Sequence, residues 1–347
     1  MTTSFDKFRS GKRQPVRLSE DELIQTGNLG GERDFPLVIR PRAEGLNLVS
    51  WAASNRDFIE QALLKNGAIL FRGFPLASVE AFEEVLRSLY GSALDYTERS
   101  SPRSQVSGKV YTSTDYPPEH PIFLHNEQSY NLVFPLRIAF FCLTAAETGG
   151  ETPIADCRRV FQKIDPAIRR AFQEKGYLYA RNFGHGLGLS WQEAFRTEDE
   201  GTVEQYCRDH EIDFEWKGQG RLCTRQRRSV GGRHPRSGDF SWFNHLTFFH
   251  VTTLAPDLRD SMRSNYAEED LPNNTYYGDG TPIETDVLDE LRAIYEAETV
   301  SFLWERGDLL LLDNMLVAHG RSSFTGARKV VVGMAEPFAW KDVEKGA

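Results

Sequence analysis

The chain has 347 residues, which is enough for one large domain or two smaller ones with a sizeable hydrophobic core. Its composition, 40% hydrophobic, 12% aromatic and 26% charged, is that of a globular protein and excludes collagen-like or largely disordered chains. Lysine and arginine total 41 and aspartate and glutamate total 50, so the formal net charge is −9. A negatively charged chain repels phosphate backbones, so we expect no nucleic-acid partner and favour a small-molecule substrate.

Hydropathy and cysteine content predict a cytoplasmic protein. No apolar run approaches the roughly 18 residues that a transmembrane helix requires, so we expect no membrane partner. The four cysteines contain no CxxC pair, which argues against a disulfide scaffold, a zinc ribbon and a thioredoxin-type site. Free cysteines are usually small buried residues, and a reducing compartment suits them.

The first 90 residues predict an irregular lead-in followed by a helix, a strand and a second helix. Residues 1–40 combine charged residues with glycines and prolines, so we expect no regular structure there. Apolar residues near helical spacing predict a helix over 51–66, which Gly67 would end. The apolar run 67–74 predicts a short buried strand, and Ser78 can cap a following amphipathic helix.

The rest of the chain predicts short strands interrupted by helices. β-Rich runs such as 136–144 and 301–312 are separated by glycine and proline, which is typical of a β-sandwich or barrel. Proline and capping patterns predict helices over 165–175 and from Thr202 onwards, and apolar periodicity predicts another over 286–298.

No internal repeat or linker-like tract divides the sequence, so we predict a single domain over residues 1–347. Within it, residues 160–300 are expected to contribute helical and loop insertions. The segment 221–236 is the only strongly basic run in the sequence. We expect a solvated loop there, with a docking surface for an acidic partner or for substrate carboxylates as the alternative.

An HxE pair is the first candidate for chemistry. The sequence contains no P-loop, HExxH, GxSxG or GxGxxG motif. His125 and Glu127, two residues apart, would project to the same face of a strand and could hold one metal ion. With 8 histidines and 50 acidic residues, chance alone supplies roughly one such pair, so the spacing needs support elsewhere.

The C-terminal part of the chain supplies that support. His319 follows the apolar run 309–312, and Arg328 precedes the apolar run 330–332. Two histidines and one carboxylate on one face of an iron ion leave three positions open for a cosubstrate and O2, as in ferrous oxygenases. We therefore expect His319 to join the HxE pair.

Five ordered motifs resemble the taurine-dioxygenase-like (TauD/TfdA) family of Fe(II)- and 2-oxoglutarate-dependent oxygenases. The resemblance extends from about residue 67 to residue 334. Its motifs are GAILFRGF (67–74), LHNEQSY (124–130), GGETPIAD (149–156), HPRSGDFSWFNH (234–245) and GDLLLLDNMLVAHGR (307–321). The syringomycin-type amino-acid hydroxylases are the branch that the chain resembles most. The resemblance implies a mainly β fold with flanking helices around a double-stranded β-helix (jelly-roll, cupin-like) core.

The resemblance also implies roles for individual residues. His125, Glu127 and His319 match the catalytic iron ligands of the family. Thr152 and Arg328 match the hydroxyl and the arginine that bind the distal carboxylate of 2-oxoglutarate. A planar guanidinium suits this role, because it can donate two parallel hydrogen bonds to a carboxylate.

Three further residues are weaker candidates. Arg321 lies two residues after His319 and could contact 2-oxoglutarate in place of Arg328. Asn244 and His245 end a motif that lies near the substrate pocket in the family, so they are candidates for substrate contact.

Two departures from the family pattern bear on the substrate. Taurine-type members hold a sulfonate with an arginine four residues after the cosubstrate arginine, and Val332 occupies that position here. Halogenases of related fold replace the carboxylate ligand with a small residue, whereas Glu127 is retained. Hydroxylation of a substrate other than a sulfonate is therefore expected.

The implied activity is hydroxylation of an unactivated C–H bond by Fe(II), 2-oxoglutarate and O2, in secondary metabolism. The implied substrate is an amino acid or amino-acid-derived metabolite, either free or bound to a peptidyl carrier protein. Two alternatives would use the same residues: a zinc-dependent hydrolase with an activated water, and a non-catalytic jelly-roll binding protein. Thr152 and Arg328 favour the oxygenase, because neither alternative needs a clamp for a dicarboxylate.

Overall fold

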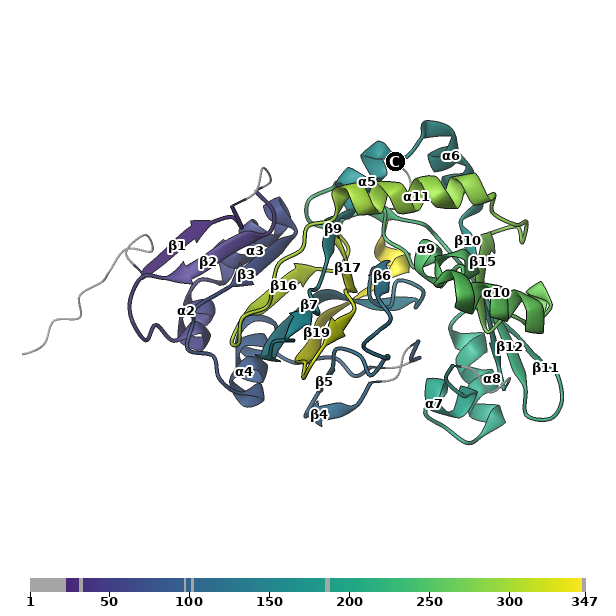
Figure 1. Cartoon of the computed structure of the whole chain (residues 1–347), viewed down its shortest axis with the longest axis horizontal. Coiled ribbons are helices and arrows are strands. Elements are labelled where there is room, and N and C mark those ends of the chain that lie inside the picture. The colour runs from purple at the N-terminus through teal and green to yellow at the C-terminus, as the bar shows by residue number, and fades with distance from the viewer. Residues whose placement is uncertain (1–22, 31–33, 97, 101–102, 185–187, 345–347) are drawn as a thin grey trace, which may run out of the picture.

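Two β-sheets that pack against each other form the centre of the fold, with helices outside them (Figure 1). The computed structural model describes residues 23–30, 34–96, 98–100, 103–184 and 188–344. The larger sheet has the order β1 (Ile24–Gly27), β2 (Leu37–Pro41), β3 (Ala68–Phe71), β16 (Leu309–Asp313), β7 (Val133–Thr144), β19 (Lys329–Ala339), β5 (Val110–Thr112) and β4 (Gln105–Ser107). The smaller sheet has the order β6 (Ile122–His125), β17 (Val317–Arg321) and β9 (Ile154–Asp156), and β8 (Thr148–Gly149) pairs with β18 (Phe324–Thr325).

Strand β16 shows how the core is divided between the two faces of the larger sheet. Leu309 and Leu311 pack with the helices outside this sheet, while Leu310 and Leu312 pack between the sheets, because successive side chains on a strand point to opposite faces. All four are fully buried, so each contributes about 1.5–3 kcal/mol of hydrophobic stabilisation. This layered architecture confirms the predicted jelly-roll core.

Helices α2 (Leu48–Ser54), α3 (Arg56–Asn66) and α4 (Val79–Tyr90) cover the outer face of the larger sheet (Figure 1). The single helix predicted over 51–66 is wrong, since Asn55 separates α2 from α3. Asn55 leaves the helical conformation and its amide donates to the Trp51 carbonyl, which is the competition with the helix that asparagine favours. Gly67 ends α3 with φ +73°, and Ser78 caps α4, as predicted.

Part of the predicted lead-in is regular structure. Residues 24–27 and 37–41 form β1 and β2, and β2 pairs in parallel with β3. Val38 and Ile39 are fully buried, so the free energy of burying them against the sheet outweighs the local proline and glycine signals. Residues 1–22 and 31–33 lie outside the described residues.

The insertion at 160–300 contains an antiparallel sheet in addition to the predicted helices. Its strands lie in the order β11 (Ile212–Trp216), β12 (Leu222–Arg228), β10 (Tyr177–Phe183) and β15 (Asn273–Tyr277). The short strands β13 (Gly232–Arg233) and β14 (Phe240–Ser241) pair with each other, and the helices are α5 (Cys157–Lys163), α6 (Pro166–Lys175), α7 (Trp191–Phe195), α8 (Glu200–Asp209), α9 (Leu246–Phe249), α10 (Pro256–Asn265) and α11 (Thr285–Glu298).

Three local predictions in the second half of the chain need correction. The basic run 221–236 is not a solvated loop, since much of it forms β12, in which Gln226 and Arg228 are buried. The helix expected from Thr202 begins earlier, because Asp199 is the residue that caps it. Only the last part of 301–312 is a strand. The two strand errors share a cause, because local pattern does not reveal which strands pair.

Two composition-based predictions can be compared with the structure. All four cysteines are free and buried, as predicted. None of the helices in the described part of the chain combines the length and the apolar character that crossing a bilayer would require.

Candidate active site

Three predicted ligands, His125, Glu127 and His319, meet between the two sheets. One potential ligand atom from each lies within 4.8 Å of the others, and all three residues are buried. His125 ends β6 and His319 lies opposite it on β17, so strand pairing aligns the two histidines. Glu127 follows β6 in a turn, so the HxE pair converges across a strand end and not along one strand face as the spacing predicted.

Both histidines present neutral imidazoles at this point. Burial lowers the pKa of His125 and lowers that of His319 well below the ordinary value. Nδ1 of His125 donates to the Phe123 carbonyl at 2.9 Å, which leaves Nε2 as a lone-pair donor. Nε2 of His319 lies 3.9 Å from Oε2 of Glu127. This donor set, two neutral imidazoles and a carboxylate, suits Fe(II).

Glu127 is held from two sides by residues that the sequence did not single out. Nη2 of Arg103 donates to Oε2 of Glu127 at 2.6 Å. Asn314 accepts from the Glu127 amide at 2.8 Å and donates to its carbonyl at 2.9 Å, which fixes the backbone of the turn. Asn314 lies within the motif 307–321, directly after a buried strand, but the motif assigned it no role, and Arg103 gives no local signal.

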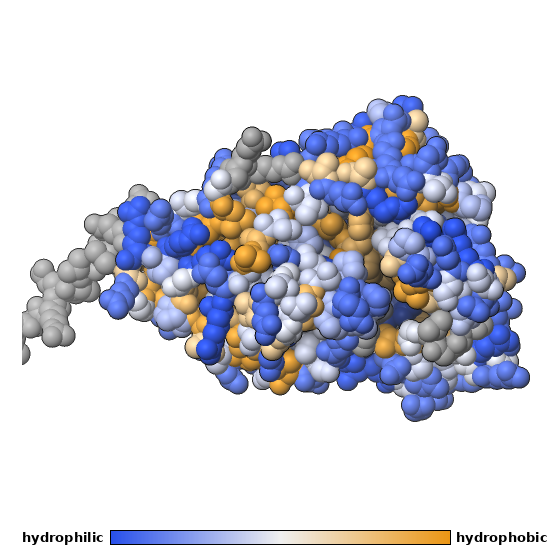
Figure 2. Space-filling model, in the orientation of Figure 1, coloured by the Kyte–Doolittle hydropathy of each residue, from blue (hydrophilic) through white to orange (hydrophobic). Residues whose placement is uncertain are grey.

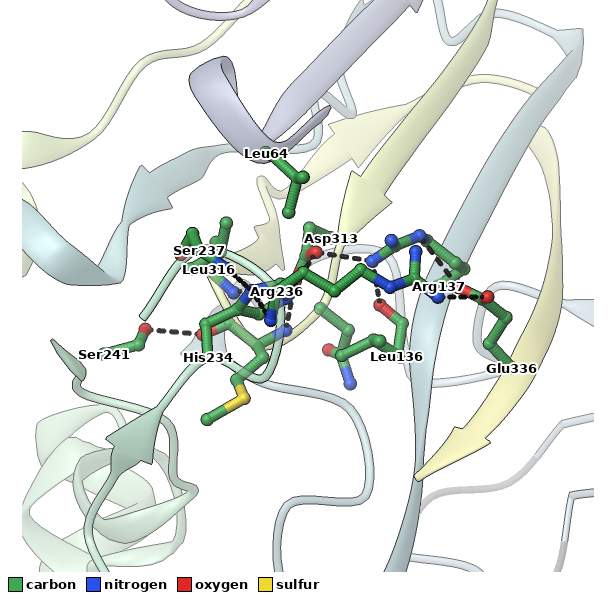
Figure 3. Close-up of polar contacts among 12 residues, drawn as sticks. Leu64, Leu136, Arg137, His234, Arg236, Ser237, Ser241, Asp313, Leu316 and Glu336 are labelled. Carbon is green, nitrogen blue, oxygen red and sulfur yellow. Dashed lines mark hydrogen bonds and ion pairs between the residues drawn. The ribbon is translucent and has the colours of Figure 1, made fainter. Parts of the chain in front are cut away.

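A buried ionic network holds the turn between β16 and β17, which carries Asn314 and leads to His319 (Figure 3). Arg137 and Asp313, both fully buried, form an ion pair. His234 lies on the other side of Asp313, with Nε2 3.0 Å from its Oδ2. Nδ1 of His234 accepts from two backbone amides, so the proton belongs on Nε2, where it faces the carboxylate.

Asp313 stabilises this turn directly. Its Oδ1 accepts from the amides of Met315 and Leu316 at 3.1 and 3.2 Å. Although burial alone would raise the pKa of Asp313, the Arg137 charge and the His234 hydrogen bond lower it below the ordinary value. The carboxylate therefore remains charged at neutral pH.

Arg328 is a cation without a carboxylate partner among the described residues. Its Nε donates to the Gly150 carbonyl at 2.8 Å and Nη1 donates to Ser113 at 3.3 Å. Burial, followed by repulsion from Arg321, lowers the pKa of Arg328 to about 10. A carboxylate bound to Arg328 would offset the free-energy cost of burying its charge.

Thr152, two residues after Gly150, is buried and can still donate a hydrogen bond. Its Oγ1 accepts from the Trp304 indole at 3.2 Å, so the hydroxyl hydrogen remains to be donated. Thr152 and Arg328 therefore offer the donors that a distal carboxylate requires.

Arg321 is engaged differently from Arg328. Its two Nη atoms donate to the backbone carbonyls of Tyr116, Pro117 and His120, at 2.7, 2.6 and 2.5 Å. Arg321 thereby orders the 116–120 loop, and this geometry favours Arg328 as the cosubstrate arginine.

The two predicted substrate contacts also differ from each other. Both ends of the Asn244 amide bind backbone, donating to Val230 at 2.8 Å and accepting from Leu246 at 3.0 Å, which indicates a structural role. His245 is buried beside the centre, with its ring centroid 5.0 Å from that of His125. Ser129 lies 2.6 Å from His245 Nδ1, and Phe249 stacks on the ring.

Comparison with known proteins gives the family. A model described as "Taurine catabolism dioxygenase TauD, TfdA family" matches residues 33–335. The dapdiamide synthesis protein DdaC of Enterobacter agglomerans is 42% identical over 279 residues, which cover 80% of this chain and 85% of that protein. A clavaminate synthase-like protein of Arabidopsis thaliana is 28% identical over 322 residues, which cover 88% of this chain and 94% of that protein.

The PvcB protein from Pseudomonas aeruginosa is a similar solved structure. It has a TM-score of 0.55 and 14% sequence identity, over 96% of this chain and 97% of that one, which shows a shared fold. The family match spans most of the sequence, including all five motifs that suggested the resemblance. The chain belongs to the TauD/TfdA family of Fe(II)- and 2-oxoglutarate-dependent dioxygenases.

Proposed function

We propose that this dioxygenase hydroxylates an unactivated C–H bond of an amino acid or amino-acid-derived metabolite at an iron held by His125, Glu127 and His319. The observation that carries the proposal is the convergence of two neutral imidazoles and one carboxylate within 4.8 Å in a buried site. Two histidines and one carboxylate leave coordination positions open, which suits a cosubstrate that chelates the metal.

Arg328, which has no carboxylate partner among the described residues, supports 2-oxoglutarate as that cosubstrate. Arg328 would bind the distal carboxylate through its guanidinium, with Thr152 adding a hydroxyl donor. Bound Fe(II) and 2-oxoglutarate together supply the oxidising power that activates O2 for insertion of an oxygen atom into a C–H bond. The protein contributes binding, orientation and exclusion of water.

Aromatic residues around the proposed ligands exclude water from the site. Phe248 stacks on His125 at 4.6 Å between ring centroids, and Phe140 lies 4.9 Å from His319. These rings limit water near the ligands and keep the imidazoles neutral. Arg103 orients the Glu127 carboxylate by a hydrogen bond to Oε2.

A role in secondary metabolism is supported by the relative named for dapdiamide synthesis. The substrate is then an amino-acid derivative that is either free or carried as a thioester on a peptidyl carrier protein. Turnover of each free amino acid, compared with the same residue loaded on a carrier protein, distinguishes these two forms.

Anaerobic spectroscopy tests the proposed function. Addition of Fe(II) and 2-oxoglutarate to the protein should produce a metal-to-ligand charge-transfer band, because chelation by the keto acid requires both. A zinc hydrolase or a metal-free binding protein would give no such band. Its absence at saturating Fe(II) and 2-oxoglutarate would contradict the proposal.

A further inference from the structure

A second guanidinium with unsatisfied donors, that of Arg103, lies beside the proposed iron site, where it contacts Oε2 of Glu127. Only Nη2 of Arg103 is used by Glu127. Nε and Nη1 of Arg103 are buried and have no hydrogen-bond partner in the described part of the chain. A buried, unpaired donor of this kind costs roughly 1–3 kcal/mol, and more when it is charged, unless a ligand occupies it.

Arg181, on the middle strand β10 of the inserted sheet, points to the same region. Nη2 of Arg181 donates to the Arg99 carbonyl at 2.8 Å. Its Nη1 is buried, makes no hydrogen bond to any residue that the structure describes and lies 3.8 Å from Glu98. Arg103 and Arg99 both lie over the Tyr96 ring, 4.6 and 5.8 Å from its centroid, and Arg181 binds the Arg99 carbonyl, so the two guanidiniums lie around one aromatic side chain.

The strand pairing of the inserted sheet adds further unpaired polar groups to this region. Thr224 pairs with Arg181, and Gln226 pairs with Tyr179, so their side chains share the face that carries Arg181. Thr224 Oγ1 and Gln226 Oε1 are buried and make no hydrogen bond to any described residue. Native interiors leave few such groups, so their concentration here indicates a ligand.

Glu98 is the carboxylate nearest to Arg181, and other side chains already donate to it. It is buried, and Gln226 and Tyr206 both donate to its carboxylate. Burial raises the pKa of Glu98 in spite of the opposing Arg181 charge.

With Fe(II) and 2-oxoglutarate bound, the site would also carry an excess of positive charge. The two charges of Fe(II) and those of Arg103 and Arg328 are opposed by Glu127 and by the two carboxylates of 2-oxoglutarate. One positive charge then remains in a site where uncompensated charge is costly. The position at which taurine-type members carry a substrate arginine is filled by Val332, which is fully buried in the apolar core and cannot supply an anion site.

We propose that Arg103 and Arg181 form a carboxylate-binding subsite, so that the substrate is an anion whose carboxylate lies beside Glu127. This inference rests on the proposed oxygenase function for the place of the substrate, and it narrows the substrate to compounds with a carboxylate. The two orphaned donors of Arg103 and Nη1 of Arg181 would bind the carboxylate oxygens. Thr224 and Gln226 offer additional hydrogen bonds to the polar part of the same molecule.

Calorimetry with paired probes tests the subsite. The Fe(II)- and 2-oxoglutarate-loaded protein is titrated anaerobically with the twenty common L-amino acids and with their α-carboxamides. At least one acid should bind at least about tenfold more tightly than its amide, because the amide cannot accept two charge-assisted hydrogen bonds. Binding of no acid, or equal binding of every acid and its amide, would overturn the proposal.

Substitutions identify which arginine causes the preference for an acid over its amide. Arg181→Gln should reduce the acid preference by about 10- to 100-fold, and Arg181→Lys should restore part of it by retaining the charge. Arg225→Gln is the matched control. Arg225 follows Thr224 on β12, and successive side chains on a strand point to opposite faces, so Arg225 lies on the other face of the sheet from Arg181. An acid preference that persists unchanged in Arg181→Gln, or is lost equally in Arg225→Gln, would refute the assignment.

Failure of this inference is distinguishable from failure of the proposed function. The charge-transfer band reports iron and 2-oxoglutarate binding independently of any substrate, so it should form in wild type and in Arg181→Gln alike. A normal band without acid preference contradicts the subsite alone. An absent band in wild type contradicts the oxygenase proposal, and the same titrations of the unloaded protein then still measure acid preference.

Discussion

Each proposed iron ligand is positioned by a different kind of contact. The carbonyl of Phe123 orients His125, an ion pair and an amide clamp hold Glu127, and strand pairing with β6 and β9 places His319. Loss of a ligand should therefore have a larger effect than loss of a residue that only orients one.

Replacement of His125 tests the ligand assignment. His125→Ala should abolish the charge-transfer band and substrate-dependent succinate release. The loss of iron affinity should exceed the roughly 10- to 100-fold typical of residues that only orient a ligand. His210→Ala is a suitable control, because His210 lies on the inserted part of the fold and its Nδ1 binds backbone. Undiminished turnover in His125→Ala would exclude His125 as a ligand.

Asn314 should act through Glu127. Asn314→Ala removes the two hydrogen bonds that fix the Glu127 backbone, so iron affinity should fall by about 10- to 100-fold while the fold persists. Anaerobic Fe(II) titration, followed by the charge-transfer band, measures this change. Asn265→Ala, at the exposed end of α10, should leave iron affinity unchanged, and an equal effect of both substitutions would contradict the assigned role.

Residue-level prediction from sequence reached side chains in the dense motifs and missed side chains whose contacts are distant in sequence. His125, Glu127 and His319 come together as the five motifs implied. Arg103 and Arg181 could not be found this way, because their significance comes from individual buried donors that have no hydrogen-bond partner among the described residues, which only the folded arrangement reveals. Asn244 lay in a recognised motif, yet its amide binds backbone.

Among the elements, the turn between β16 and β17 depends most on buried charge. Arg137 pairs with Asp313 inside the protein and also contacts Glu60 and Glu336. Arg236 binds the same two glutamates from a more exposed position. The two arginines therefore form a natural comparison between buried and exposed ion pairs.

Urea unfolding should separate these two arginines. Arg137→Met leaves Asp313 buried without its cation and should cost about 3–5 kcal/mol of unfolding free energy. Arg236→Met should cost no more than about 1 kcal/mol, because its pairs are solvent-screened. Similar costs for the two variants would show that Asp313 does not depend on Arg137.

The segment after α9 should give the protein a pH-dependent stability. Burial, followed by the charges of Arg292 and Arg263, lowers the pKa of His250 to about 4. His250 Nδ1 accepts from the Thr252 amide at 3.2 Å, so the neutral ring fits the fold. An unfolded His250 binds a proton near pH 6.5, so stability is present above that pH and is lost as pH falls toward 4.

Replacement of His250 measures this contribution. Between pH 7 and pH 5, wild type should lose about 2 kcal/mol more unfolding free energy than His250→Gln, which has no titrating group at this position. Urea unfolding of both proteins at the two pH values gives the difference. Equal losses would show that His250 has the same pKa in the folded and unfolded protein.

Element boundaries were predictable where local chemistry determines them. Ser78 and Gly67 mark a helix start and a helix end in both sequence and structure. β1, β2 and β12 were missed, because their pairing with distant strands gives them their conformation. The sequence of a strand indicates its own propensity but not which strand pairs with it.

At the scale of the whole molecule, the inserted four-stranded sheet lies beside the jelly-roll and completes the site from one side (Figure 1). Figure 2 shows a hollow in this face between the jelly-roll and the inserted part. The jelly-roll supplies the proposed metal ligands, while the inserted sheet supplies Arg181. The proposed carboxylate subsite therefore combines Arg103, just before β4 of the larger sheet, with Arg181 of the inserted sheet.

The central claim is that one iron ion lies among His125, Glu127 and His319. Crystals grown anaerobically with Fe(II) and 2-oxoglutarate, and measured at the iron absorption edge, test it most directly. The account predicts a single strong anomalous peak within coordination distance of all three side chains, about 2.0–2.2 Å from the nitrogens and the carboxylate oxygen. A peak elsewhere, or no peak in crystals that contain stoichiometric iron, would contradict it.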